Sequence, residues 1–147
     1  VLAGQDDAAG AERAYGQAVD SGHPVYAYMA RVNLGFLLVN RGAVGEAREV
    51  FQAAVESRPL ERGPRARVGI GEVLLAEGKS GEAEGVFREV LGVGDSGTVP
   101  LALHGLGRAL AAQGDVVGAR EVYLRAAGCG HAEIAAWARG ALEALEG

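Results

Sequence analysis

A short motif recurs along this chain at a fixed spacing of 36 residues. Its three full copies all end on an aromatic residue: Gly45-Glu-Ala-Arg-Glu-Val-Phe51, Gly81-Glu-Ala-Glu-Gly-Val-Phe87 and Val117-Gly-Ala-Arg-Glu-Val-Tyr123. A shorter copy, Gly10-Ala-Glu-Arg-Ala-Tyr15, precedes them. Self-similarity with a period of a few tens of residues is typical of stacked structural units. The chain is therefore predicted to be a repeat array.

The apolar residues inside each repeat follow the spacing of a helix. Leu34, Leu37 and Leu38 lie three or four positions apart, which is a helical period and not the alternation of a strand. A glycine follows each such stretch, and glycine accepts the left-handed conformation that closes a helix. These glycines are Gly42, Gly78 and Gly114. Each unit is therefore predicted to be two helices joined by a short turn.

A second set of glycines lies inside the predicted first helices. A glycine there costs about 1 kcal/mol relative to alanine, so its presence indicates that another helix approaches closely. We expect the second helix of each pair to press a small residue against this bare patch, with an aromatic side chain filling the space beside it. The glycines are Gly35, Gly71 and Gly107, the small residues Ala47, Ala83 and Ala119, and the aromatic residues Phe51, Phe87 and Tyr123.

This order of Leu-Gly, glycine, alanine and aromatic residue resembles the tetratricopeptide repeat over almost the whole chain. The period is 36 residues where the family's is about 34, and Arg31, Arg67 and Leu103 replace the aromatic residue near the start of the family's first helix. The resemblance implies an all-α, right-handed superhelical solenoid of antiparallel helix pairs, forming one domain over 1–147. Its expected parts are a partial repeat (1–24), three helix pairs (25–60, 61–97 and 98–130) and a capping or partial-repeat helix (131–147).

The loops and ends carry further expectations. The two extra residues per repeat are expected to lengthen the inter-repeat loops, where Pro59, Pro64 and Pro100 lie. Residues 1–5 have the pattern of the end of a preceding helix, so the chain is expected to open inside a repeat of a longer array. The register of the last helix stays open between capping the third pair and beginning a fourth.

Composition excludes several functional classes. The formal net charge of −5 argues against nucleic acid, which would favour a basic surface. No apolar run approaches the about 20 residues that span a bilayer, so no membrane partner is expected. Cys129 is the single cysteine, which fits a reduced, cytoplasmic protein. Lys79 is the only lysine among 14 basic residues, a bias that indicates a GC-rich bacterial genome.

In the resembled family, the first helices line the concave face of the superhelix, which receives a segment of a partner protein. For each residue on that face, a solvated helix surface is the alternative reading. The lysine and asparagine clamp by which some members hold an acidic chaperone terminus is missing. The candidate groove residues are Met29, Val32, Asn33, Phe36, Asn40, Arg65, Val68, Glu72, Leu101, His104 and Arg108.

Four arginines lie close together in the segment that follows the motif ending at Phe51. They are Arg58, Arg62, Arg65 and Arg67, and they could attract an acidic partner. The alternative is a solvated loop.

Some patterns suggest catalysis or a cofactor, but each lacks the neighbouring structure or residues that the function requires. Gly92-Val-Gly94-Asp-Ser-Gly97 matches a dinucleotide fingerprint but follows a predicted helix and not a strand. Cys129 and His131 lie on a glycine-rich loop with no orienting third group. The three histidines fall in different repeats, without the spacing of a metal site. We therefore expect no enzyme activity, no cofactor and no metal.

Two functional hypotheses remain. The first is a protein-interaction scaffold that binds a peptide or helix in its concave groove. The second is a homo-oligomer or a module that joins domains of a longer regulatory protein. The fold alone does not identify the partner.

Overall fold

The computed structural model describes residues 2–146, with the side chains of residues 9, 10 and 12–146. All regular structure in this part is helical, in agreement with the predicted fold class. The helices are α1 (Leu2–Asp20), α2 (Pro24–Asn40), α3 (Val44–Ser57), α4 (Pro64–Ala76), α5 (Ser80–Val93), α6 (Val99–Ala112), α7 (Val116–Ala127) and α8 (Ala132–Glu146).

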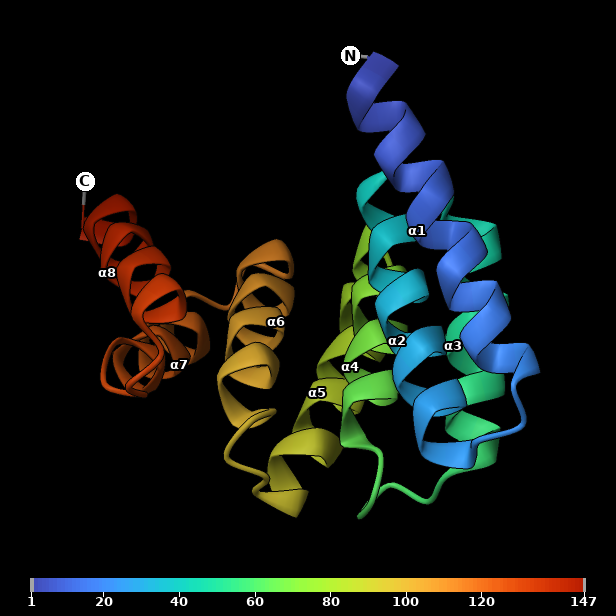
Figure 1. Ribbon diagram of the computed structural model, residues 1–147. Coiled ribbons are helices and arrows are strands. Elements are labelled where there is room, and N and C mark those ends of the chain that lie inside the picture. The colour runs from blue at the N-terminus through green and yellow to red at the C-terminus, as the bar shows by residue number, and fades with distance from the viewer. Residues whose placement is uncertain (1, 147) are drawn as a thin grey trace.

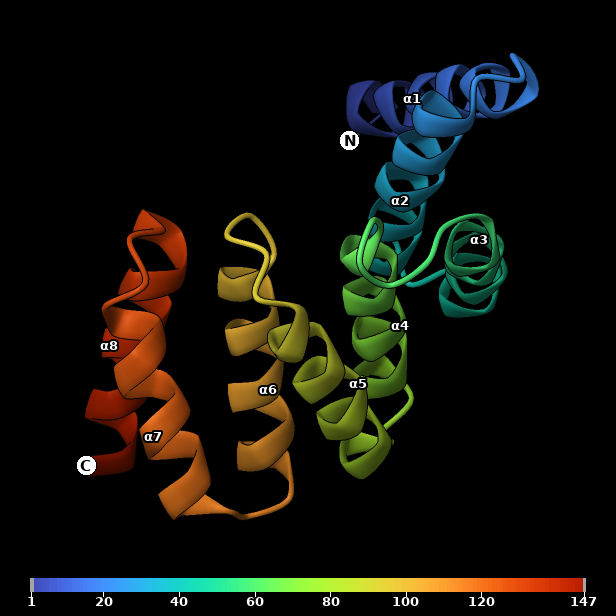
Figure 2. The same ribbon diagram turned by 90° about the horizontal axis from the view of Figure 1, so that it is seen from below.

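The helices form two rows. Each helix packs against the next along the chain, and α2, α4, α6 and α8 also touch one another in turn. Over the described residues, α3, α5 and α7 make no such contacts among themselves, so they form the outer row of a curved array. Figures 1 and 2 show this succession from two directions, with the termini at opposite ends of the array.

Glycine and proline set the helix ends. Gly42, Gly78 and Gly114 have φ angles of 81°, 78° and 79°, which confirms the predicted left-handed closures. Pro64 and Pro100 lie within the first turns of α4 and α6, and both are buried. The expectation that they belong to loops was wrong, because proline is favoured at the first helical positions, where a missing N–H costs no hydrogen bond.

The first helix differs from the expectation for residues 1–5. Leu2–Asp20 is one continuous helix, so no turn separates the first residues from the first repeat motif. The physical reason lies in the closing glycine of the other repeats. The equivalent position, 36 residues before Gly42, is Asp6, which does not favour the left-handed closure.

The core is organised by aromatic rings held between glycines of successive repeats. A Cβ atom added to Gly35 or Gly69 would clash with the ring of Phe51, at 2.4 and 2.2 Å from its nearest atom, and one added to Gly71 or Gly105 would clash with the ring of Phe87. Both phenylalanines are fully buried. Each ring therefore packs against its own repeat's first helix and the next one.

This packing corrects the expectation about the small residues. Ala47, Ala83 and Ala119 are fully buried, but it is the ring and not the alanine that occupies the bare patch. Close approach of the helices at Gly35, Gly71 and Gly107 is as predicted. The partner glycines of the following repeat, Gly69 and Gly105, were not predicted.

The third aromatic residue has a different second neighbour. A Cβ on Gly107 would lie 2.7 Å from the ring of Tyr123 and 3.0 Å from that of Trp137. The two rings meet edge to face at 5.2 Å. The equivalents of Gly105 and Gly107 on α8 are Ala141 and Glu143, so no second glycine receives Tyr123.

Tyr28 joins α2 to the start of α4. Its buried hydroxyl accepts a hydrogen bond from the backbone N–H of Ala66 at 3.1 Å. Gly63, the residue before α4, has no side chain to cap the helix, so this hydroxyl satisfies one of the free N–H groups of the first turn. Burial raises the pKa of Tyr28, which keeps the hydroxyl protonated.

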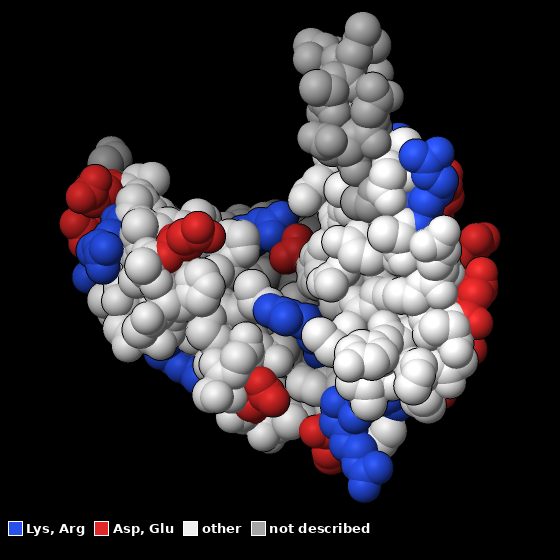
Figure 3. Space-filling view, viewed as in Figure 1, with Lys and Arg blue, Asp and Glu red and all other residues white. Residues whose placement is uncertain are grey.

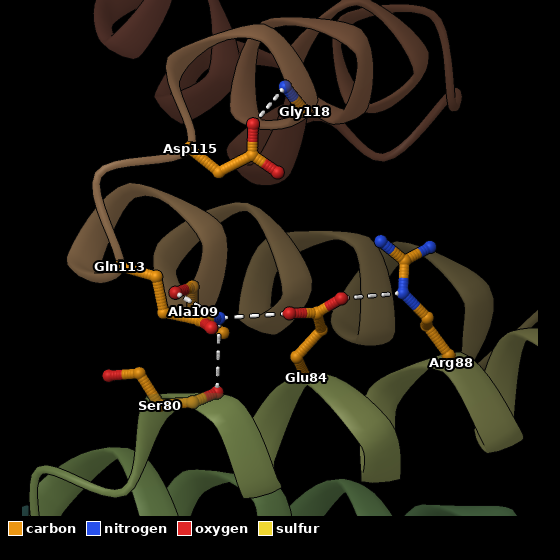
Figure 4. Close-up of polar contacts among 7 residues, drawn as sticks. All are labelled: Ser80, Glu84, Arg88, Ala109, Gln113, Asp115 and Gly118. Carbon is orange, nitrogen blue, oxygen red and sulfur yellow. Dashed lines mark hydrogen bonds and ion pairs between the residues drawn. The ribbon is translucent and has the colours of Figure 1, made fainter.

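A polar cluster holds the outer row to the inner row further along (Figure 4). The side-chain amide of Gln113, at the end of α6, donates to Glu84 of α5 at 2.9 Å and to the backbone oxygen of Ala109 at 3.1 Å. Glu84 also accepts from Arg88 at 2.9 Å. These two side-chain hydrogen bonds, led by Gln113, lower the pKa of Glu84. The hairpin between α6 and α7 is in turn closed by Asp115, which accepts from the N–H of Gly118 at 2.9 Å.

We predict that Gly71→Ala destabilises the fold. The added methyl group would lie 2.5 Å from Phe87 Cζ, and the ring cannot retreat because Gly105 holds its other side. Overpacking of this kind costs about 1–3 kcal/mol. Gly85→Ala is the matched control, since Gly85 lies exposed within α5 with no atom near its Cβ position, and it should gain up to about 1 kcal/mol. Urea unfolding measures both, and equal effects would contradict the ring packing.

We also predict that Tyr28→Phe lowers the free energy of unfolding by about 1–3 kcal/mol, because the N–H of Ala66 loses its partner. Tyr26→Phe should change stability by less than about 0.5 kcal/mol, because Tyr26 is 64% exposed. Thermal unfolding of the two variants compares them directly. Similar melting temperatures would show that the hydroxyl of Tyr28 is not required.

Candidate functional site

The inner row of helices surrounds a hollow (Figure 3). It opens between the N-terminal helices on the right of the view and the C-terminal helices on the left, and basic and acidic groups lie together on its floor. Its walls come from α2, α4, α6 and α8, the helices that touch one another in the inner row. Residues one period apart on these helices form rows across the hollow.

Helix α2 carries accessible, uncharged residues. Asn33 and Asn40 are exposed, and Met29 is 52% exposed. Neither asparagine amide makes a hydrogen bond within the described residues. An exposed amide offers both a donor and an acceptor, which suits the backbone of a peptide.

Phe36 is more a core residue than a groove residue. It is half-buried and meets the ring of Phe51 edge to face, with 5.1 Å between centroids. It also packs against all three hydrophobic clusters of the array. Phe36 is therefore only partly available to a ligand.

Val32 and Val68 were wrongly predicted to face the groove. Each is 1% exposed. Val32 packs with Tyr28, Ala54 and Ala66, and Val68 belongs to the main core cluster. Their side chains point between neighbouring helices, because the face that packs is set by the next repeat as well as by the helix's own partner.

An ion pair spans two repeats in the same row as Phe36. Arg108 of α6 donates to both carboxylate oxygens of Glu72 of α4, at 2.8 and 3.0 Å. The side chain of Glu72 is only 16% exposed. Charge-assisted pairs of this kind are strong, so Arg108 is already engaged and has less capacity to bind a partner's carboxylate.

Aromatic groups line the C-terminal side of the hollow. The ring of His104 meets that of Trp137 edge to face at 4.3 Å, and Trp137 in turn meets Tyr123. Burial lowers the pKa of His104, and the neighbouring Arg108 lowers it further, while Glu72 opposes them. His104 is therefore neutral at neutral pH and presents an aromatic edge.

The remaining predicted residues lie in the first turns of their helices. Arg65 is exposed at the start of α4, and Leu101 is half-buried at the start of α6. Three accessible residues were missed by sequence reasoning: Val25, Tyr26 and Trp137. Trp137 could have been found, because it lies two periods after Arg65 and one period after Leu101, at the equivalent position.

A separate, mainly apolar pocket of about 300 Å³ lies between α1, α2 and α3. Val19, Leu34 and Val50 line it, with Arg31 and two acidic residues also at its surface. This pocket is open to solvent and not enclosed.

The glycine-rich fingerprint and the loop with Cys129 and His131 both lie at helix ends. Gly94 closes α5 with a φ of 73°, and Asp95 accepts hydrogen bonds from the N–H groups of Gly97 and Thr98. The Nδ1 of His131 accepts from the N–H of Ile134 at 3.3 Å, so this histidine caps α8. Among the side chains that the structure describes, no three metal-binding groups gather, and no described helix is long and apolar enough to cross a bilayer.

Comparison with known proteins gives a family and no individual relative. No curated protein and no solved structure matches the chain. A family model described as tetratricopeptide repeat matches residues 1–62, 47–99 and 68–146, three overlapping segments that span nearly the whole sequence. With the helix pairs, the closing glycines and the 36-residue period, this match shows that the chain belongs to the tetratricopeptide repeat family.

Proposed function

We propose that this chain is a non-catalytic scaffold that holds a peptide or helix of a partner protein in its concave groove. Tetratricopeptide repeats generally mediate protein–protein interaction and typically lack catalytic activity.

The accessible wall of α2 carries this proposal. Asn33 and Asn40 lie two turns apart on one helix face, exposed and without hydrogen bonds to other described residues. Met29 lies on the same face. Amides that bind a peptide backbone, next to apolar side chains that bind its side chains, are the usual components of a peptide-binding groove.

The floor of the groove is expected to attract a charged ligand only weakly. Since Glu72 and Arg108 neutralise each other, a ligand meets little net charge at this point. His104 and Trp137 offer aromatic edges on the opposite wall. We therefore expect the ligand to be recognised in the groove mainly through its backbone and its apolar side chains.

Self-association is the second candidate function. The observation that favours it is an apolar strip on α7, where Val116, Val117 and Leu124 are 54%, 73% and 54% exposed. Exposed apolar residues that lie together mark candidate contact surfaces. Light scattering over a range of concentrations tests this, because a constant monomer mass would contradict it.

We predict that Asn33→Arg combined with Asn40→Arg abolishes capture of the natural partner from lysate. Two long charged side chains would fill the α2 wall and remove both amides, while arginine has the better helix propensity and leaves the core intact. The measurement is affinity capture followed by mass spectrometry.

The matched control is Gln17→Arg combined with Gln52→Arg. It adds the same charges at exposed positions of α1 and α3, outside the inner row. A partner retained by the wild type and the control but lost by the asparagine variant supports groove binding. Retention by all three proteins would refute it.

A further inference from the structure

The first turns of α2 and α4 form one surface. The hydroxyl of Tyr28 accepts from the N–H of Ala66, and a Cβ on Gly63 would lie 3.0 Å from the ring of Tyr28. The residues that follow Tyr28 and precede Ala66, Met29 and Arg65, are both exposed. An apolar side chain and a cationic one are thus presented on either side of the same buried hydrogen bond.

The apolar part of this surface is concentrated. Val25, Tyr26 and Met29 are 52%, 64% and 52% exposed. Large apolar side chains with this much exposure occur at only one other place among the described residues, the strip on α7. Three of them within five consecutive residues form a patch, and patches mark binding sites where single exposed residues do not.

The basic part lies directly beside it. Arg62 and Arg65 take part in no ion pair with a described residue, and the guanidinium carbon of Arg58 lies 5.3 Å from the centre of the Tyr28 ring. The charges of Arg58 and Arg65 are close enough to lower the pKa of Tyr28 against the larger effect of burial. Figure 3 shows basic groups beside an acidic group at the lower edge of the molecule, where the loop before α4 lies in Figure 1.

Acidic residues are sparse in both segments. The chain has no Asp or Glu from Ser21 to Gly45, and Glu61 is the only one from Ser57 to Gly71. In a protein with a net charge of −5, this local excess of arginine is a reversal of the overall sign. Such a patch attracts negative charge over about 10 Å at moderate ionic strength.

The loop before α4 also differs from its counterparts in the other repeats. Gly22, Gly94 and Gly130 occupy equivalent positions with φ angles of 81°, 73° and 82°. The fourth member of this series is Arg58, which is extended with a φ of −145°. Arg58 places a guanidinium over Tyr28 in a loop that borders the apolar patch.

We infer that the corner formed by Val25, Tyr26, Met29, Arg58, Arg62 and Arg65 docks an acidic segment of a partner protein that also carries an apolar side chain. The inference rests on the proposed function, because it states the chemistry of the segment that the scaffold holds. A carboxylate matches the planar guanidinium of Arg62 or Arg65, and an aliphatic or aromatic side chain covers Met29 and Tyr26. Nucleic acid fits less well, because the basic area is small and the whole chain is acidic.

The test is a selection of random peptides displayed on phage against the wild-type protein. The enriched sequences should combine Asp or Glu with Leu, Phe or Trp a few positions away. A labelled peptide from this set should bind the Arg62→Glu, Arg65→Glu variant about tenfold more weakly or worse, and increasing salt should weaken its binding to the wild type. Replacing the acidic residues of the peptide by lysine should restore binding to the variant.

The matched control is Arg125→Glu combined with Arg139→Glu, which makes the same change of charge at exposed arginines of α7 and α8. It should bind the peptide like the wild type. Circular dichroism verifies that both variants fold.

Several results would overturn the inference. Peptides without acidic residues, or peptides that bind the Arg62→Glu, Arg65→Glu variant as well as the wild type, would do so. Loss of binding only in the Asn33→Arg, Asn40→Arg variant would leave the groove proposal standing and remove the corner. If the wild type forms a dimer that the Arg62→Glu, Arg65→Glu variant does not form, the occupant of the corner is a second copy of the chain. If an oligothymidine binds through the same arginines, the occupant is nucleic acid. Failure to enrich any peptide would count against both proposals.

Discussion

The array depends on an aromatic ring held between glycines of two successive repeats. Phe51 lies against Gly35 and Gly69, and Phe87 lies against Gly71 and Gly105. Such packing brings helices close together, and each ring connects its own repeat to the next. Stability of repeat proteins is approximately a sum of intrinsic and nearest-neighbour terms, so these rings supply a central part of each interface.

The distinctive surface residues lie at positions where one repeat differs in sequence from the others. Arg58 replaces a glycine in one loop, and that loop brings cations beside exposed apolar residues. Phe36, Glu72 and Arg108 occupy equivalent positions, yet one is apolar and the other two form an ion pair. The equivalent positions in the core stay similar, because packing limits their size, whereas those facing solvent are free to diverge. Binding specificity therefore lies in the irregular positions.

Periodicity alone was sufficient to predict the helix pairs and the glycine closures, because those depend on local backbone preferences. It did not predict the second glycine of each ring site, since Gly69 and Gly105 belong to the following unit and their role appears only when repeats stack. Val32 and Val68 were misplaced for the same reason. The pairing of Glu72 with Arg108 was within reach, because opposite charges one period apart meet across adjacent helices of the inner row. Exposure of Tyr26 and Val25 depends on tertiary context, and no sequence pattern indicates it.

The clamped rings also determine how the motion of this array can be observed. A phenylalanine ring can rotate by half a turn only if the atoms on both of its faces move away, and glycine backbones on both sides leave little free volume for that rotation. Rotation of Phe51 or Phe87 thus requires neighbouring first helices to separate for a moment. The exchange rate between the two edges of each ring, seen by NMR, consequently reports how often adjacent repeats come apart.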